Sequence, residues 1–149
     1  MDIFSISTLF ISALTLTALL YQSFSLTKSL RTQSYQHIIS SQTAIDRIFL
    51  ENPELRPFLY EDVDLPDSQS EIGRRARVVI DVALNVIDST YQQRDLIPKE
   101  MLASWLHYAS EVTNHKGVKQ FLNEYPNWYP IANRDEYTKL LQEIEKHEI

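Results

Sequence analysis

Cysteine is absent from the 149-residue chain, and glycine occurs only at Gly73 and Gly117. A chain without cysteine cannot form a disulfide, hold zinc through thiolates or attack a substrate with a thiolate. The scarcity of glycine disfavours β-hairpins, because their tight turns need residues that adopt positive φ. Helices separated by proline and asparagine are the alternative, so the composition predicts an all-α protein.

Positive charge is also scarce. The chain has 14 Lys and Arg against 20 Asp and Glu, which gives a net charge of −6. Such a balance argues against nucleic acid as a partner, because phosphate backbones are bound by basic surfaces. With 44% hydrophobic and 23% charged residues, the composition is otherwise that of an ordinary folded protein.

The first fifty residues organise the rest of the chain. Residues 3–50 contain no Gly or Pro, which predicts one long helix. Residues 3–20 hold twelve apolar residues and six Ser or Thr, and no charged residue occurs in 3–27. A stretch of about 20 such residues spans a bilayer core. We therefore predict a transmembrane anchor over 1–27 and a cytoplasmic helical bundle over 28–149, with three long helices and several short ones.

The charges that flank this stretch predict its orientation. Lys28 and Arg31 follow it directly, whereas only Asp2 precedes it. Basic residues mark the cytoplasmic side, so we expect a single-pass protein of an inner, cytoplasmic-type membrane with its N-terminus outside. A cleaved secretory signal would need a basic start and a small-residue cleavage site, and neither is present. A helix lying on the membrane surface would carry a basic polar face, which this stretch lacks.

Four hydroxyl residues share one face of the predicted anchor. Ser5, Thr8, Ser12 and Thr15 are separated by steps of three and four residues. Small and hydroxyl side chains allow close helix packing in membranes, which predicts contact with another membrane protein or with a second copy of the chain. The alternative is that each hydroxyl bonds its own helix backbone and faces lipid. The spacing leaves both interpretations open.

Beyond the anchor, apolar spacing predicts the remaining helices. The first helix continues with a seam of apolar residues in which Gln42 is the only polar member, and it ends at Asn52-Pro53. Apolar residues at steps of three and four then predict a short helix over 53–60 and long helices over about 70–93 and 98–114. A final helix is expected to end near His147. The predicted seam of the first helix is Tyr35, Ile38, Gln42, Ile45 and Phe49.

Four charged residues lie on the otherwise apolar second long helix: Arg74, Arg77, Asp81 and Asp88. Arg77 and Asp81 have the spacing of an ion pair within one helix. The four are candidates for a buried polar network or a ligand site. Structural ion pairs between helices are much commoner at such positions, and we favour that interpretation.

An aromatic turn follows the helices. Tyr125, Trp128 and Tyr129 lie between Pro126 and Pro130 or beside them. Such a cluster is a candidate binding platform. More often it closes the end of a helical bundle with its polar atoms facing water, and we favour that role.

No set of residues indicates a reaction. The acidic loop 61–70 contains no Gly and lacks the ligand spacing of a calcium loop. His107 and Glu111 form a lone pair with helical spacing, and none of the four His follows Glu at the distance that di-iron bundles use. We therefore assign no catalytic, cofactor-binding or metal-binding residue, and we expect a protein without enzymatic activity.

The order of these features resembles a known class. A short apolar N-terminus leads to residues 49–56, then to an Arg/Ala-rich helix around Arg77, a helix centred on Trp105 and a closing Trp128-Tyr129. This order is similar to uncharacterised bacterial single-pass membrane proteins that carry a cytoplasmic helical domain of unknown function. The resemblance implies a membrane-tethered helical domain and supplies no activity.

Two functions remain in view. The first is a membrane-anchored interaction protein, an accessory subunit or scaffold that docks beside another membrane protein. The second is a membrane-tethered sensor or small-ligand-binding module that uses Arg74, Arg77, Asp81 and Asp88. Membrane lipid is an expected contact in both.

Overall fold

A computed structural model describes residues 3–129 and 136–147, and these residues form helices and no strand. The all-α prediction is confirmed. The first and longest element, α1, runs without interruption over Ile3–Glu51. It ends where Pro53 disfavours the helical conformation of Asn52. The long helix expected over residues 3–50 is therefore confirmed as well.

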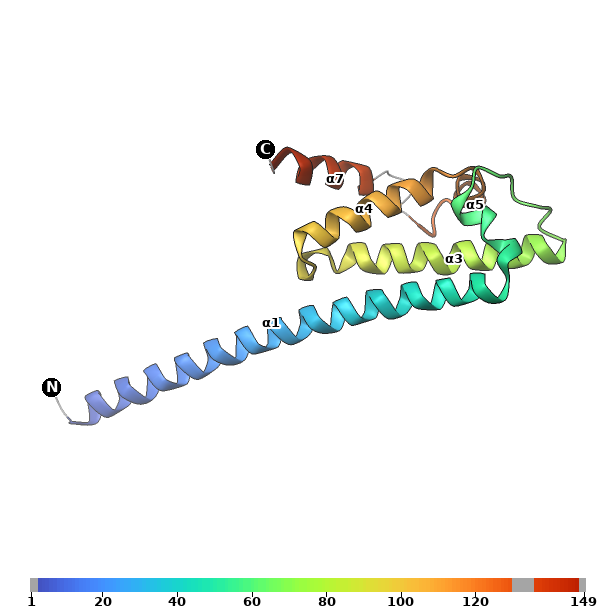
Figure 1. Ribbon diagram of the computed structural model, residues 1–149. Helices are drawn as coiled ribbons and strands as arrows, with labels where there is room; N and C mark the ends of the chain where they lie inside the picture. The colour runs from blue at the N-terminus through green and yellow to red at the C-terminus, as the bar shows by residue number, and fades with distance from the viewer. Residues whose placement is uncertain (1–2, 130–135, 148–149) are drawn as a thin grey trace.

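The helix α1 has two parts with different surroundings. Figure 1 shows its N-terminal part projecting from the rest of the molecule with no other element beside it. Every side chain described between Thr8 and Gln33 is exposed, and Ser34 is the first buried one. We call residues 3–33 the projecting arm, and the remainder of the described chain the helical domain.

The elements of the helical domain follow α1 in close succession. Their order and bounds are η1 (Pro53–Leu55), α2 (Pro57–Tyr60), α3 (Glu71–Gln92), η2 (Arg94–Leu96), α4 (Lys99–Asn114), α5 (Lys116–Glu124) and α7 (Glu136–His147). The expected short helix over 53–60 is instead a 3-10 turn and an α-helical turn, with Pro57 beginning the second. The two long helices begin and end within about one residue of the predicted positions.

The core lies around α3. This helix packs along the C-terminal part of α1, while α7 packs along α4 (Figure 1). Side chains with almost no exposure come from several elements, among them Ile45 of α1, Leu59 of α2, Ile80 of α3, Leu106 of α4 and Val118 of α5. Burial of each such aliphatic side chain contributes about 1.5–3 kcal/mol.

The long loop between α2 and α3 is fastened at both ends. At α3, the Ser70 side chain accepts a hydrogen bond from Gly73 N at 3.0 Å and so caps the helix. A Cβ on Gly73 would lie 2.0 Å from the carbonyl oxygen of Asp67, so only glycine allows this approach. At α5, Asp62 Oδ1 accepts a hydrogen bond from Lys116 N at 3.0 Å. The loop is held against two helices.

One member of the predicted α1 seam is wrong. Tyr35 is 48% exposed, and the buried side chain beside it is Ser34. Ile38, Ile45 and Phe49 are buried as expected. At its N-terminal end, the face of α1 that packs on the domain therefore contains Ser34 in place of the expected Tyr35. The small Ser side chain suits close packing there.

Candidate functional site

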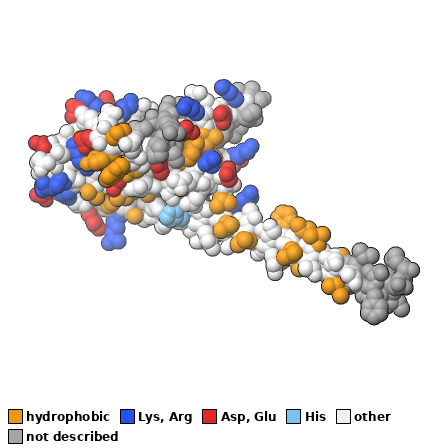
Figure 2. Space-filling model, turned by 180° about the vertical axis from the view of Figure 1, so that it is seen from behind, with side chains coloured by type: hydrophobic (Ala, Val, Ile, Leu, Met, Phe, Trp, Pro, Cys, Tyr) orange, Lys and Arg blue, Asp and Glu red, His pale blue; other side chains and the backbone are white. Residues whose placement is uncertain are grey.

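The arm carries most of the exposed large hydrophobic side chains among the described residues. An 18-residue window between Phe10 and Glu51 has a mean hydropathy of 1.3 and no buried residue, so α1 is long and apolar enough to cross a membrane. Figure 2 shows charged side chains gathered over the helical domain, with hydrophobic and uncharged ones along the arm. Phe10, Tyr21 and Phe24 are each more than 60% exposed. An apolar surface of this kind is covered by lipid or by protein.

The predicted hydroxyl stripe lies along this arm. Thr8, Ser12 and Thr15 have exposed side chains, and the side chain of Ser5 lies outside the described residues. Thr15 Oγ1 donates a hydrogen bond to the carbonyl oxygen of Ile11, four residues earlier, at 2.9 Å. That bond leaves the Thr15 oxygen able to accept another, so it is compatible with both interpretations of the stripe.

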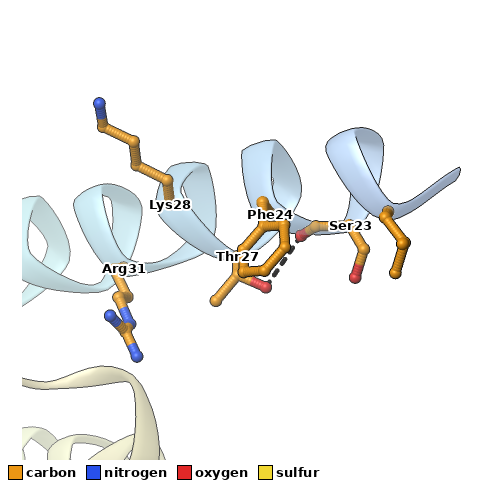
Figure 3. A pocket seen from close by; sticks show the side chains of 6 residues that line it. Ser23, Phe24, Thr27, Lys28 and Arg31 are labelled. Carbon is orange, nitrogen blue, oxygen red and sulfur yellow. Dashed lines mark hydrogen bonds between the residues drawn. The ribbon is translucent and has the colours of Figure 1, made fainter. Parts of the chain in front are cut away.

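A shallow groove of 570 Å³ runs along α1 where the arm approaches the domain. Its apolar end contains Leu20 and Phe24, and its opposite end contains Lys28 and Arg31. Figure 3 shows the Phe24 ring between these ends, with Arg31 directed toward the ribbon of the domain and Lys28 directed the other way. We call it the junction groove, and its lining is Leu20, Ser23, Phe24, Thr27, Lys28 and Arg31.

The charged residues predicted to form one network on α3 are held by separate partners. Arg77 donates to both carboxylate oxygens of Glu124 on α5, at 2.8 and 2.6 Å, and to the carbonyl oxygen of Pro66 at 2.9 Å. The expected pairing of Arg77 with Asp81 is therefore wrong. Glu124 lies 47 residues away in sequence. It is the partner in place of Asp81 because its carboxylate accepts two parallel hydrogen bonds from the guanidinium. The Arg77 guanidinium lowers the pKa of Glu124.

The two aspartates of α3 accept hydrogen bonds from tyrosines near the C-terminus. Asp81 accepts from the hydroxyl of Tyr129, and Asp88 accepts from the hydroxyl of Tyr137 on α7. Burial raises the pKa of Asp88, while the Tyr137 hydroxyl opposes that effect. The carboxylate of Asp88 is therefore less readily ionised than an exposed one.

Arg74 stands apart from the other three. Its guanidinium donates to the carbonyl oxygen of Gln69, and it lines a groove of 380 Å³ beside Val78. Its neighbour Arg75 donates to Asn52 and forms an ion pair with Glu54 at 3.1 Å. The structure therefore divides the four predicted residues among α5, the C-terminal tyrosines and the loop before α3. Of the four, Arg77 makes an ion pair with another helix, and the other three make hydrogen bonds to tyrosine hydroxyls or to a loop carbonyl. A ligand role for the set stays a prediction.

The aromatic turn has one buried and one exposed end. The ring of Tyr125 lies 4.6 Å from that of Trp128 and 4.9 Å from that of Phe121, measured between centroids. Tyr129 is 3% exposed, whereas Trp128 is 64% exposed. Packing is thus the role of Tyr129, and its hydroxyl donates a hydrogen bond to Asp81.

Sequence reasoning missed a second polar cluster inside the domain. Gln42 Oε1 and Trp105 Nε1 are buried and have no hydrogen-bond partner among the described residues. Nearby in the fold, the hydroxyls of Tyr60 and Tyr108 are 3.1 Å apart, and burial raises the pKa of Tyr108. Gln42 is the one polar position in an apolar seam, and this signal could have found half of the cluster. Nothing in the spacing of Trp105 indicated that its N–H would be unpaired.

The described residues contain no group of three His, Asp or Glu side chains that could hold a metal ion.

No family model matches this chain, and comparisons with curated proteins and with solved structures gave no match. The resemblance to single-pass membrane proteins therefore stays a prediction, and function must be argued from the geometry alone.

Proposed function

We propose that this chain is a membrane-anchored, non-enzymatic interaction protein, an accessory subunit or scaffold that docks beside another membrane protein. The anchor comprises residues 1–27 of a single-pass protein in an inner, cytoplasmic-type membrane. The N-terminus lies outside and the helical domain lies in the cytoplasm.

The observation that carries the proposal is the exposed apolar arm. Its large side chains are 54–76% exposed over residues 10–26, and it has no contact with the domain to cover them. A helix of 25 residues, from Ile3 to Thr27, is about 37 Å long, against a bilayer core of about 30 Å. Lipid is the environment that removes this surface from water at no cost to the domain.

The continuity of α1 gives the anchor its mechanical role. From Lys28 to Ser34 the helix rises about 9 Å, somewhat more than the ~5–7.5 Å thickness of one headgroup layer. Since no Gly or Pro interrupts α1, one unbroken helix joins the proposed anchor to the domain. A scaffold that presents a fixed face to a neighbouring membrane protein needs this arrangement.

The chemistry of the domain supports a binding role without catalysis. The charged side chains of α3 are engaged in contacts between elements: Arg77 with Glu124, Asp81 with Tyr129 and Asp88 with Tyr137. These groups are used in contacts that hold segments of the domain together. The proposal therefore assigns the activity to surfaces and assigns none of it to a reaction.

The partner contact is assigned to the hydroxyl face of the arm. Ser12 and Thr15 lie on this face, and Phe10 lies on the opposite one. A second transmembrane helix, from another membrane protein or from a second copy, can approach small hydroxyl side chains closely and accept their hydrogen bonds.

Single-cysteine crosslinking tests the proposal, and the natural chain contributes no background thiol. Cells expressing Ser12→Cys or Phe10→Cys are fractionated, washed with alkaline carbonate and treated with a thiol crosslinker. We expect both variants to stay in the membrane fraction and Ser12→Cys alone to give a crosslinked product, which mass spectrometry then identifies. If carbonate washing releases the chain from the membrane fraction, the proposed anchor is wrong. If both variants crosslink equally, the assignment of the partner contact to the hydroxyl face is wrong.

A further inference from the structure

The junction groove continues the seam by which α1 binds the domain. Leu20, Phe24, Thr27, Arg31 and Ser34 follow one another in alternating steps of four and three residues, so they share one face of the helix. From Ser34 onward this face is buried by the domain, and before Ser34 it is open. The groove is therefore the uncovered extension of an interface, directly beneath the edge of the domain.

The charges of the groove have no partner among the residues that the structure describes. Lys28 and Arg31 are the only Lys, Arg, Asp or Glu residues in 3–45. Neither makes an ion pair or a side-chain hydrogen bond with any residue that the structure describes. Two adjacent cations without a counter-ion, in a chain whose net charge is −6, mark a local site for an anion.

The order of side chains along the groove matches the order of groups in a phospholipid. Leu20 and Phe24, 54% and 76% exposed, lie on the side of the anchor, where acyl chains are found. Ser23 and Thr27 come next along the groove, and Lys28 and Arg31 come last, on the side where the proposed anchor would leave the hydrocarbon core. Figure 3 shows both basic side chains at the same end of the groove, directed to different sides of α1.

We propose that the junction groove binds one anionic phospholipid, with its acyl chain along Leu20 and Phe24 and its headgroup at the end of the groove that carries Lys28 and Arg31. This inference rests on the proposed membrane anchor. The bound lipid fills the space beneath the domain edge and so fixes the domain's angle to the membrane. The rest of the acidic chain supplies no general attraction to an anionic surface, so a preference for such lipids would originate here.

The test measures lipid binding to the full chain in detergent micelles by native mass spectrometry, with phosphatidylglycerol or phosphatidylcholine added. We expect phosphatidylglycerol to bind at least about ten-fold more tightly. Lys28→Gln and Arg31→Gln should each weaken it about five-fold, the effect of one juxtamembrane charge. The matched control is Lys119→Gln, an exposed cation on α5, which should change nothing.

A second pair of variants tests the apolar end. Phe24→Ala should weaken both lipids alike, whereas Phe10→Ala, an equally exposed ring outside the groove, should weaken neither. Equal affinity for the two lipids, or an unchanged preference in the Lys28→Gln/Arg31→Gln double variant, would overturn the inference. So would displacement of the lipid by glycerol phosphate at a similar concentration, since that indicates a site for phosphate alone.

Carbonate extraction of the same proteins separates this inference from the proposed function. If the chain stays in the membrane but shows no preference for phosphatidylglycerol, the proposed anchor is supported and the proposed lipid site is wrong. A chain that carbonate removes from the membrane loses the proposed function itself.

Discussion

The ion pair between Arg77 and Glu124 makes a quantitative prediction about the helical domain. Arg77 is 13% exposed and Glu124 is 38% exposed, and two hydrogen bonds of 2.8 and 2.6 Å join them. A bond to a charged group contributes about 1.5–3 kcal/mol when it is shielded from water. Because Glu124 is more than a third exposed, solvent screening reduces the pair to about 1–2 kcal/mol.

A double-mutant cycle measures this coupling directly. Thermal unfolding of the full chain in detergent is followed by the fluorescence of Trp105 and Trp128 for the natural chain, Arg77→Ala, Glu124→Ala and the double variant. We expect Arg77→Ala to cost about 2–4 kcal/mol, more than Glu124→Ala, because Pro66 also loses a hydrogen-bond donor. In a chain of this size each kcal/mol lowers Tm by about 3–5 °C.

The exposed pair Arg47 and Glu51 on α1 is the matched control. Its two side chains are 78% and 64% exposed at an N–O distance of 3.0 Å. The same cycle should give about 0.3–0.5 kcal/mol there. Equal coupling for the two pairs would refute the claim that the Arg77 contact joins α3 to α5.

The pH dependence of the same cycle follows from the lowered pKa of Glu124. The folded value lies below the unfolded one, so the stabilisation is present above the unfolded pKa and is lost as pH falls through the folded pKa. We expect the coupling to be constant near neutral pH and to disappear in acid below the ordinary Glu range.

Three further predictions concern single positions. Asp88→Asn should raise Tm near pH 7 and not near pH 4. Because the pKa of Asp88 is raised in the folded chain, the natural chain loses stability as pH rises from the ordinary pKa of 3.8 to the folded-state pKa. The Asn side chain does not ionise and can still accept a hydrogen bond from the Tyr137 hydroxyl. Gly73→Ala should lower stability by about 1–3 kcal/mol in the same melts, since a Cβ 2.0 Å from Asp67 O outweighs the ~1 kcal/mol by which Ala favours a helix. Gln42→Leu should raise stability by about 1 kcal/mol, because it removes a buried acceptor without a partner.

Opposite signs would refute each of these arguments. A stabilised Gly73→Ala chain would mean that helix propensity governs the start of α3 and that the approach of the loop is unimportant. A destabilised Gln42→Leu chain would mean that the Gln42 oxygen is bound to water or to a partner in solution. A deficit of Asp88→Asn that grows with pH would mean that the ionised carboxylate is the stabilising form.

Local patterns predicted the helices well because each is specified by near neighbours in the chain. The absence of Gly and Pro in residues 3–50 is enough to make α1 continuous, and Pro53 is enough to end it. The apolar steps of α3 and α4 gave their bounds within about a residue. The same reasoning placed Tyr35 on the wrong face, because periodicity alone does not say which of two adjacent residues the domain covers.

Side-chain partners were less predictable because they come from distant parts of the chain. Spacing suggested Asp81 for Arg77, while the folded chain brings Glu124 to it across the loop and α5. The sequence likewise excluded a calcium site from the acidic loop 61–70 but named no partner for its carboxylates. In the structure Asp62 binds the backbone of Lys116, and Asp64 binds its side chain at 2.7 Å. Attraction between opposite charges is present in any sequence, but its geometry requires the fold.

The sequence by itself determined that this protein is helical, that its first helix is unbroken and that two lone cations follow an uncharged run, since all three depend only on residue order. Tertiary structure decided where the domain begins to cover α1 and which carboxylates and hydroxyls the charges of α3 contact. It also decided that the open face before Ser34 is continuous with a buried one. Those facts depend on distances between segments far apart in the chain, which are set only when the core around α3 closes.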